Sequence, residues 1–332
     1  MNPQQLFSSF AERVIRGEAL GQFEARQILN SAPEDIFHLL AASNEVRRHF
    51  KGDAVNFCAV ISAKSGACPE DCAFCAQSAH HAANAPVYPL MHPEKILEHA
   101  RAAQAMGANK VGIVTSGPGI DNEQEMSMLC DALSGVARET GVDRCASLGS
   151  LDSGQLARLK AAGLQSVHHN IETAESFFKN ICSTHTYRDR VEMVRRAREA
   201  GFYVCSGGIF GMGETSEHRI EMALALRGLD VDSIPLNFLN PIPGTRLESA
   251  QPLHPLEILK IIAMFRFLLP EKDIRICGGR EKNLRSLQPL MYAAGANCTM
   301  LGNYLTTQGR NYLEDIEMIS DLGLHRFTGR EE

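Results

Sequence analysis

The sequence lacks several features that would assign it to whole classes of protein. No run of 18 apolar residues occurs in its 332 residues, so we expect no membrane-spanning segment. The 33 Lys and Arg are outnumbered by 39 Asp and Glu, giving a net charge of −6, which argues against a nucleic-acid partner. The first residues contain neither a basic run nor an apolar segment, so we expect no secretory signal and a cytoplasmic protein.

Cysteine, by contrast, is abundant. The chain has ten cysteines, and no tryptophan. In a short secreted chain ten cysteines would indicate disulfides, but in a long chain without a secretory signal they indicate metal binding or catalysis. The cysteines are therefore the feature that an account of function has to explain.

The pattern of strands and helices predicts a (β/α)8 barrel. Eight segments have strand character: Val55–Ser62, Lys110–Thr115, Arg144–Leu148, Ser166–Ile171, Tyr203–Phe210, Ser233–Leu239, Ile274–Gly278 and Ala296–Leu301. Segments of helical periodicity separate them, with apolar residues at Met126, Leu129, Leu133 and Val136, at Val191, Val194 and Ala197, at Ile258, Ile261, Ile262 and Phe265, and less clearly at Phe177, Ile181 and Thr184. Glycines that suit a left-handed helix end precede four of the strands, at Gly107, Gly163, Gly201 and Gly295. Strands that alternate with helices form parallel βαβ units, and eight such units close a barrel.

We expect one barrel domain over residues 51–332, preceded by a helical extension over residues 1–50. An open doubly wound sheet would call for a Gly-rich loop of the GxGxxG type after its first strand, and the sequence has none there. In a (β/α)8 barrel the active site lies at the C-terminal ends of the strands.

Three cysteines directly after the first predicted strand form a candidate metal site. Cys68, Cys72 and Cys75 have the spacing CxxxCxxC. A structural zinc site uses four ligands, commonly in two pairs, and no second CxxC or HxxxH pair is present. Three thiolates on a [4Fe-4S] cluster would leave one iron free for a substrate or cofactor. The spacing therefore favours such a cluster.

This motif resembles that of the radical S-adenosylmethionine superfamily. In that superfamily S-adenosylmethionine binds the open iron and is cleaved to a 5′-deoxyadenosyl radical. The resemblance implies that Phe74, in the aromatic position before the third cysteine, lies beside the adenine through its backbone.

Further blocks resemble the biotin synthase family, in the same order along the chain. They are Ser65–Cys72, His169–Thr173, Cys205–Ile209, Gly211–Glu214, Pro235–Leu239, Gly278–Glu281 and Leu305–Thr307. The resemblance implies conversion of dethiobiotin to biotin, with sulfur from an auxiliary iron–sulfur cluster in the barrel. It also implies a flavodoxin or ferredoxin as electron donor, iron–sulfur assembly proteins as partners, and a homodimer.

The resemblance assigns roles to individual residues. It places Glu172, at the end of the fourth strand, on the ribose hydroxyls, Gly207 and Gly208 beside the cofactor, and Arg190 near the S-adenosylmethionine carboxylate. It places Asn170 and Asn237 on the ureido ring, and Thr306 and Thr307 on the substrate carboxylate. His168 stands where the family commonly has Asn as a second ureido contact. Simpler roles stay open: a turn at the two glycines, a solvated helix face for Arg190 and a helix N-cap for the threonines.

The chain departs from the family at the auxiliary cluster. The usual ligands are three cysteines and one arginine on a [2Fe-2S] cluster; Cys145, Cys205 and Arg275 match three of them, but the fourth position is Gly112. Cys58 is the first candidate to replace the missing thiol, Cys277 the second and Cys298 the third. We therefore expect an altered auxiliary cluster, and the hypothesis is a cluster of four irons with an extra sulfide. Each of these cysteines could instead be a small buried apolar residue, and no role is expected for Cys130 or Cys182.

Two other functions remain open from the sequence. One is a different radical S-adenosylmethionine enzyme, such as an iron-hydrogenase maturase, which would not need Cys145 and Cys205 on facing strands. The other is a non-enzymatic iron–sulfur carrier, which would have no use for Glu172, Asn170 and Asn237.

Overall fold

Eight parallel strand positions close into a barrel in the computed structural model, which describes residues 2–120, 122–307 and 309–328. The strands are β1 (Ala54–Lys64), β2 (Lys110–Thr115), β3 (Asp143–Ser147), β4 (Ser166–His168), β5 (Tyr203–Cys205), β6 (Gly208–Phe210), β7 (Ser233–Phe238), β8 (Asp273–Ile276) and β9 (Cys298–Met300). The strands pair in the order β1-β2-β3-β4-β5-β7-β8-β9, with β6 also paired to β7, and β1 pairs with β9, which closes the sheet. The predicted (β/α)8 barrel is confirmed.

All eight predicted strand segments contain strand, but two of them are altered. The segment predicted over Tyr203–Phe210 is divided into β5 and β6 by a break at Ser206 and Gly207. The segment predicted over Ser166–Ile171 ends already at His168, so Glu172 lies in the following loop and not at a strand end. Glu172 has a φ of +68° and forms an isolated bridge with Gly208, which carries its carboxylate toward the barrel mouth.

Helices surround the barrel in the predicted alternation. They are α4 (Pro93–Ala105), α5 (Glu123–Glu139), α6 (Ser153–Ala161), α7 (Glu175–Phe178), α8 (Tyr187–Glu199), α9 (Ser216–Gly228), α10 (Pro255–Leu268), α11 (Arg280–Leu284), α12 (Leu290–Ala293) and α13 (Tyr312–Asp321). Gly107, Gly163, Gly201 and Gly295 all have positive φ, as the helix-end prediction requires. Among the described residues no helix is both long enough and apolar enough to cross a membrane.

The predicted helical periodicity through Ile181 and Thr184 is wrong. Only Glu175–Phe178 is helical, and the chain from 179 to 186 is a loop. The backbone groups of this loop bond to another part of the chain: Ile181 O accepts from Ala73 N–H at 2.8 Å, and the Asp71 carboxylate accepts from Ser183 N–H at 2.8 Å. The tertiary contacts therefore replace the helical hydrogen bonds.

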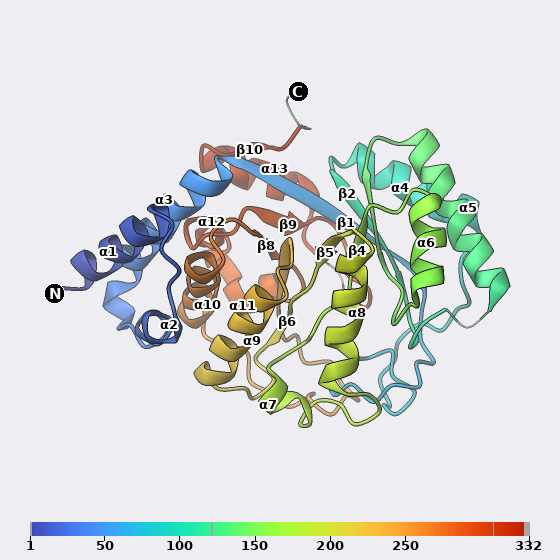
Figure 1. The fold of residues 1–332 in the computed structure, drawn as a ribbon, viewed down its shortest axis with the longest axis horizontal. Helices are drawn as coiled ribbons and strands as arrows, with labels where there is room; N and C mark the ends of the chain where they lie inside the picture. The colour runs from blue at the N-terminus through green and yellow to red at the C-terminus, as the bar shows by residue number, and fades with distance from the viewer. Residues whose placement is uncertain (1, 121, 308, 329–332) are drawn as a thin grey trace.

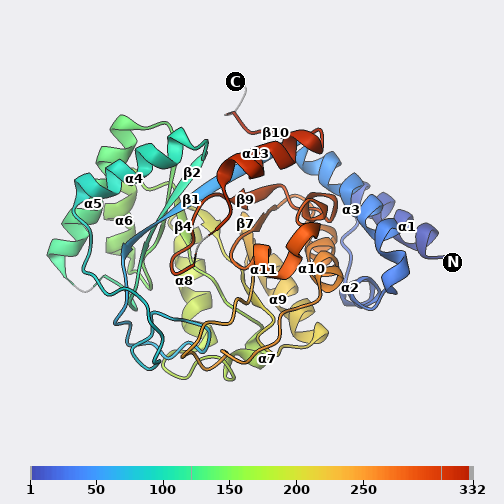
Figure 2. The same cartoon turned by 180° about the vertical axis from the view of Figure 1, so that it is seen from behind.

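Three helices precede the barrel: α1 (Pro3–Ile15), α2 (Gln22–Leu29) and α3 (Ile36–Lys51). They pack beside α10 and α12, on the side of the barrel away from α4, α5 and α6, as Figures 1 and 2 show. Their apolar side chains, among them Phe7, Phe10 and Val46, belong to the same buried core as the barrel strands.

A short strand near the C-terminus, β10 (His325–Arg326), pairs with the start of β1. The loops that follow the strands gather at the opposite end, where the cysteine loop and α7 lie (Figure 1).

Candidate active site

One cavity of about 690 Å³ opens at the C-terminal ends of the barrel strands. Its wall includes Cys68, Cys72 and Cys75 from the loop after β1. It also includes thiols of the barrel interior, Cys145 and Cys205 among them. Cys145 and Cys205, which follow the three loop cysteines by 70 residues or more in the sequence, therefore face the same space as they do.

The cysteine loop is held in shape by its own backbone. Cys68 N–H donates to Gln77 O at 3.0 Å, and Ala79 N–H donates to Cys68 O at 2.8 Å. Gly66 has a φ of +77°, and a Cβ there would lie 2.6 Å from a Val87 methyl group, so the turn into the loop requires glycine. Cys72 is buried, and Cys68 and Cys75 are half-buried. Three thiols that line one cavity from a closed loop fit a cluster with three protein ligands.

The cysteine loop is also fastened to the loop between α7 and α8. The Asp71 carboxylate accepts hydrogen bonds from the backbone N–H and the hydroxyl of Ser183, at 2.8 and 2.5 Å. Burial opposes ionisation of Asp71, but the hydrogen bonds from Ser183 lower its pKa well below the usual range. The Arg246 guanidinium donates to Asp71 O at 3.0 Å and to Ile181 O at 2.9 Å.

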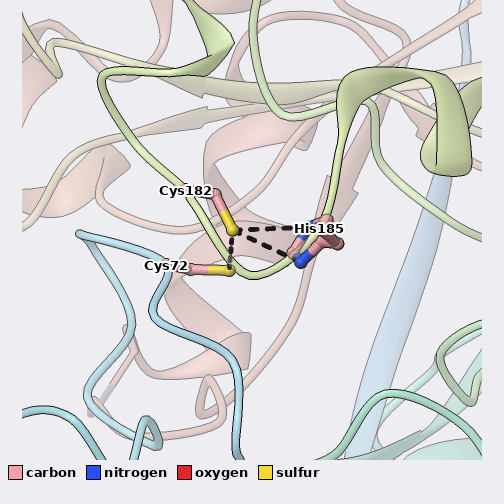
Figure 3. Close-up of side chains that lie close together, drawn as sticks. All are labelled: Cys72, Cys182 and His185. Carbon is pink, nitrogen blue, oxygen red and sulfur yellow. Dashed lines mark hydrogen bonds between the residues drawn. The ribbon is translucent and has the colours of Figure 1, made fainter.

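Cys182 and His185, in this second loop, were not predicted as functional residues. Their CxxH spacing was the sequence signal that could have drawn attention to them. Cys182 Sγ lies 3.9 Å from Cys72 Sγ and 3.3 Å from His185 Nδ1, as Figure 3 shows. The contact with Cys72 lowers the pKa of Cys182 to about 4 although burial opposes this.

Arg190 connects this loop with the acid of the site. From the first turn of α8 it donates to His185 Nε2 at 2.9 Å and to Asn170 O at 3.0 Å, and it lies 3.5 Å from Glu172 Oε1. His185 Nδ1 in turn lies 2.6 Å from Glu70 Oε2. Arg190 therefore lines the cavity and does not lie on a solvated helix face.

Gly207 and Gly208 are required by packing within the protein. A Cβ on Gly207 would lie 2.0 Å from Pro235 O, and one on Gly208 would lie 2.1 Å from Glu172 O. Neither glycine is among the residues that line the cavity, whereas Glu172 and Phe74 are. Gly208 thus allows the backbone carrying Glu172 to approach β6 closely, and Gly207 allows the close approach of Pro235 on β7.

Asn170 and Asn237 both line the cavity and are held by backbone groups. Asn170 Oδ1 accepts from Gly207 N–H at 3.1 Å, and its Nδ2 donates to Glu172 at 3.3 Å. Asn237 Oδ1 accepts from Gly278 N–H at 3.0 Å, and its Nδ2 donates to Gly208 O at 3.2 Å. Each amide retains one N–H and one lone pair, so each can still donate to and accept from a ligand.

The remaining predicted substrate residues also border the cavity. His168 on β4 is the register partner of Cys205 on β5. Burial lowers the pKa of His168 to about 4, so its imidazole is neutral at pH 7. Thr306 and Thr307 lie on the wall in the loop after β9. They do not cap the next helix, because Asn311 fills that position and accepts from Leu313 N–H.

The inner thiols come from several strands of the barrel. Cys58, Cys145, Cys205 and Cys277 all line the cavity, as does Arg275. Cys298 is fully buried on β9 and is not among the lining residues. Burial and the neighbouring Cys205 raise the pKa of Cys145 to about 12, while Lys110 and Arg275 oppose this rise. The Cys145 thiol therefore stays protonated unless a metal or a further positive charge takes the proton's place.

Arg275 carries an unsatisfied donor among these thiols. Its Nη1 is buried and has no hydrogen-bond partner. Burial opposes its charge, but the surrounding cysteines Cys58, Cys298, Cys205 and Cys277 raise its pKa overall. A buried guanidinium N–H without a partner is costly. An anionic cluster held by the thiols would supply the missing acceptor, so the residues fit such a group.

Gly112 faces the same space beside Cys145. Its register partners are Val60 on β1 and Cys145 on β3. The nearest atom to a Cβ built there would be a Val60 methyl carbon at 3.6 Å, which is ordinary contact. The position therefore has room for a side chain, and its lack of a thiol is not imposed by packing.

Comparisons with known proteins agree with this geometry. Residues 63–226 match the model of the radical SAM superfamily, and residues 235–325 match that of the biotin and thiamin synthesis associated domain. The biotin synthase of Geobacter sulfurreducens is 54% identical over 316 residues, covering 95% of this chain and 96% of that protein. The chain belongs to the biotin synthase family. The biotin synthase of Clostridium acetobutylicum is 49% identical over 317 residues, with 95% and 97% covered.

Solved structures share the fold at low identity. A methylornithine synthase has a TM-score of 0.84 at 21% identity, covering 96% of this chain and 97% of that one. The FeFe-hydrogenase maturase from Carboxydothermus hydrogenoformans has a TM-score of 0.81 at 18% identity, covering 97% and 79%. At these identities the similarity shows the fold alone.

Membership in the biotin synthase family makes the chain a radical S-adenosylmethionine enzyme and a sulfurtransferase. It implies a [4Fe-4S] cluster and S-adenosylmethionine as cofactors, a small-molecule substrate and an electron donor.

Proposed function

We propose that this biotin synthase converts dethiobiotin to biotin with sulfur from an auxiliary cluster held by the inner thiols. The observation that carries the proposal is the single cavity that Cys72 and Cys205 both line. A radical formed at the outer cysteines and a sulfur source at the inner ones could then act on one substrate between them.

At the outer end of the cavity, Cys68, Cys72 and Cys75 would bind the [4Fe-4S] cluster, which supplies the electron for radical formation when S-adenosylmethionine is bound. Glu172 offers a charged acceptor for the ribose hydroxyls, and Arg190 places a positive charge between Glu172 and Cys72. Phe74 lines the same part of the wall. Gly208 would act on the cofactor indirectly, by allowing the Glu172 backbone to reach its position, and Gly207 by allowing Pro235 to pack against the break between β5 and β6.

In the middle of the cavity, Asn170 and Asn237 would bind the ureido ring, because each keeps a free donor and a free acceptor. Neutral His168 would add a third polar contact in place of the usual amide. Thr306 and Thr307 would bind the carboxylate from the loop after β9.

At the inner end, Cys58, Cys145 and Cys205 would hold the auxiliary cluster, with Arg275 donating to it and Cys277 as a further ligand. Cys298 is less suited, because it does not face the cavity. Gly112 removes one ligand of the usual [2Fe-2S] set, whereas the added thiols of Cys58 and Cys277 suit a larger cluster. We propose four irons and an extra sulfide, so that one sulfide can leave while the core stays bound.

We further propose a flavodoxin or ferredoxin as the electron donor, iron–sulfur assembly proteins as partners, and a homodimer. These follow from resemblance to the family.

An assay of two products tests the proposed reaction. Reduced, cluster-loaded protein is incubated anaerobically with S-adenosylmethionine and dethiobiotin. Biotin together with 5′-deoxyadenosine is the expected result. Formation of 5′-deoxyadenosine without biotin would favour a different radical enzyme such as a maturase, and absence of both products would favour a cluster carrier.

A further inference from the structure

The contact between Cys72 and Cys182 has no part in the proposed reaction. Cys72 is a ligand of the outer cluster, whereas Cys182 lies outside the CxxxCxxC motif, 110 residues further along the chain. Their sulfur atoms are 3.9 Å apart, and both residues are buried. Among the described residues, no other two cysteine sulfurs are in hydrogen-bond contact.

The backbones on both sides of this contact are fastened together. Ala73 N–H, next to Cys72, donates to Ile181 O, next to Cys182, at 2.8 Å. Arg246 bonds to the carbonyls of the residues before each cysteine, Asp71 and Ile181. The Asp71 carboxylate binds Ser183 directly after Cys182. These contacts do not involve either sulfur, so the two thiols stay neighbours whether or not Cys72 binds iron.

The two thiols differ in access. Cys72 lines the cavity, whereas Cys182 is not among the lining residues. A small molecule in the cavity would therefore meet Cys72 first. His185 Nδ1 and Asp71 Oδ1 lie 3.3 and 3.2 Å from Cys182 Sγ and hold it in place.

We propose that Cys72 and Cys182 form a reversible disulfide in the cluster-free chain, and that this bond prevents the outer cluster from being loaded. The oxidant is a small-molecule disulfide such as glutathione disulfide. Cys72 loses its proton as it attacks one sulfur of this disulfide, and one glutathione leaves; Cys182 then loses its proton as it attacks Cys72 in the mixed disulfide, and the second glutathione leaves. The two cysteines lose two electrons and two protons, and both protons end on the two glutathione thiols. The sulfurs approach by about 1.9 Å to reach the length of a disulfide.

The bond and the cluster exclude each other, because both need the Cys72 sulfur. The disulfide would shield Cys72 from irreversible oxidation until a thiol reductant and iron are available. The inference depends on Cys72 as a ligand of the outer cluster and not on the proposed auxiliary cluster, so either can fail without the other.

Mass spectrometry of the full-length chain tests the inference. Iron-free protein is exposed to glutathione disulfide, alkylated and digested without reductant. We expect a Cys72–Cys182 cross-link as the main product, and none in cluster-loaded protein treated in the same way. Cross-links among Cys68, Cys72 and Cys75, or glutathione that stays on Cys72, would overturn the proposal.

Two variants sharpen the result. In Cys182→Ser, glutathione should accumulate on Cys72 because no second thiol can displace it. Cys130→Ser, in α5 and away from the cavity, is the matched control and should cross-link as the parent does. If Cys182→Ser does not fold, the presence or absence of the Cys72–Cys182 cross-link in the parent chain still tests the proposal.

Uptake of iron and sulfide at the outer site is an independent test of the proposal. Oxidised parent protein should take up iron and sulfide at the outer site only after treatment with dithiothreitol. Uptake at an equal rate before and after that treatment would show that the bond does not control loading.

Discussion

The outer and the inner cysteines of this cavity are brought together in different ways. Cys68, Cys72 and Cys75 lie within eight residues of one loop, which local hydrogen bonds close. Cys58, Cys145 and Cys205 lie on three strands, and barrel closure alone brings them to one space. A change in the loop therefore acts on one site by itself, whereas a change in the inner set tests how the strand register places ligands from distant parts of the chain.

The largest expected effect separates the two groups of cysteines. Cys68→Ala should abolish both 5′-deoxyadenosine and biotin, because the outer cluster loses a ligand. Cys205→Ala should abolish biotin but leave 5′-deoxyadenosine formation, because the outer loop is untouched. Chromatographic analysis of both products under single-turnover conditions measures this. Loss of 5′-deoxyadenosine in Cys205→Ala, with the outer cluster loaded, would show that the two sites are not independent.

Gly112→Cys should change the inner cluster without disturbing the fold. The nearest atom to the new Cβ is at 3.6 Å, so the side chain fits, and the variant completes the three-cysteine, one-arginine set. We expect its Mössbauer spectrum to gain a [2Fe-2S] component that the parent lacks. Gly112→Ala is the control for the added Cβ and should keep the parent spectrum.

Asp71→Asn should weaken the outer site with a smaller effect. The substitution removes the charge that accepts from Ser183, which costs about 1–3 kcal/mol for a hydrogen-bonded carboxylate. Lower retention of iron at the outer site under a chelator is the expected result, with the inner cluster unchanged. Asp143→Asn, at the exposed start of β3, is a matched control.

His168 should make stability depend on pH. Its pKa is lowered by burial from 6.5 to about 4, so between these values the unfolded chain takes up a proton that the folded chain does not. Stability is therefore lost as pH falls from 6.5 to 4, by about 2–3 kcal/mol from this group. Urea unfolding at pH 7 and pH 5 measures it. In His168→Asn the drop should be smaller; an equal drop would assign it to other groups.

The two regions also differ in how far the sequence predicts them. The CxxxCxxC spacing predicts the outer ligands because all three cysteines are close in sequence. The inner ligands follow only once the barrel is recognised, and the separation of Cys298 from the cavity needs the register of β9. The CxxH spacing marks Cys182 in the sequence, but the contacts of Cys182 and Arg246 could not be found from local patterns, because they join loops 110 to 175 residues apart. The helical periodicity through Ile181 gave a wrong prediction for the same reason, because the Ile181 carbonyl accepts a hydrogen bond from Ala73 in the distant cysteine loop.

The central claim is that two clusters of different kinds share the cavity. Mössbauer spectroscopy of anaerobically purified, iron-57-labelled protein, combined with iron and sulfide analysis, tests it most directly. The account predicts the outer [4Fe-4S] signal together with a second, four-iron signal that disappears in Cys205→Ala. A clean [2Fe-2S] signal beside the [4Fe-4S] signal in the parent protein would contradict it.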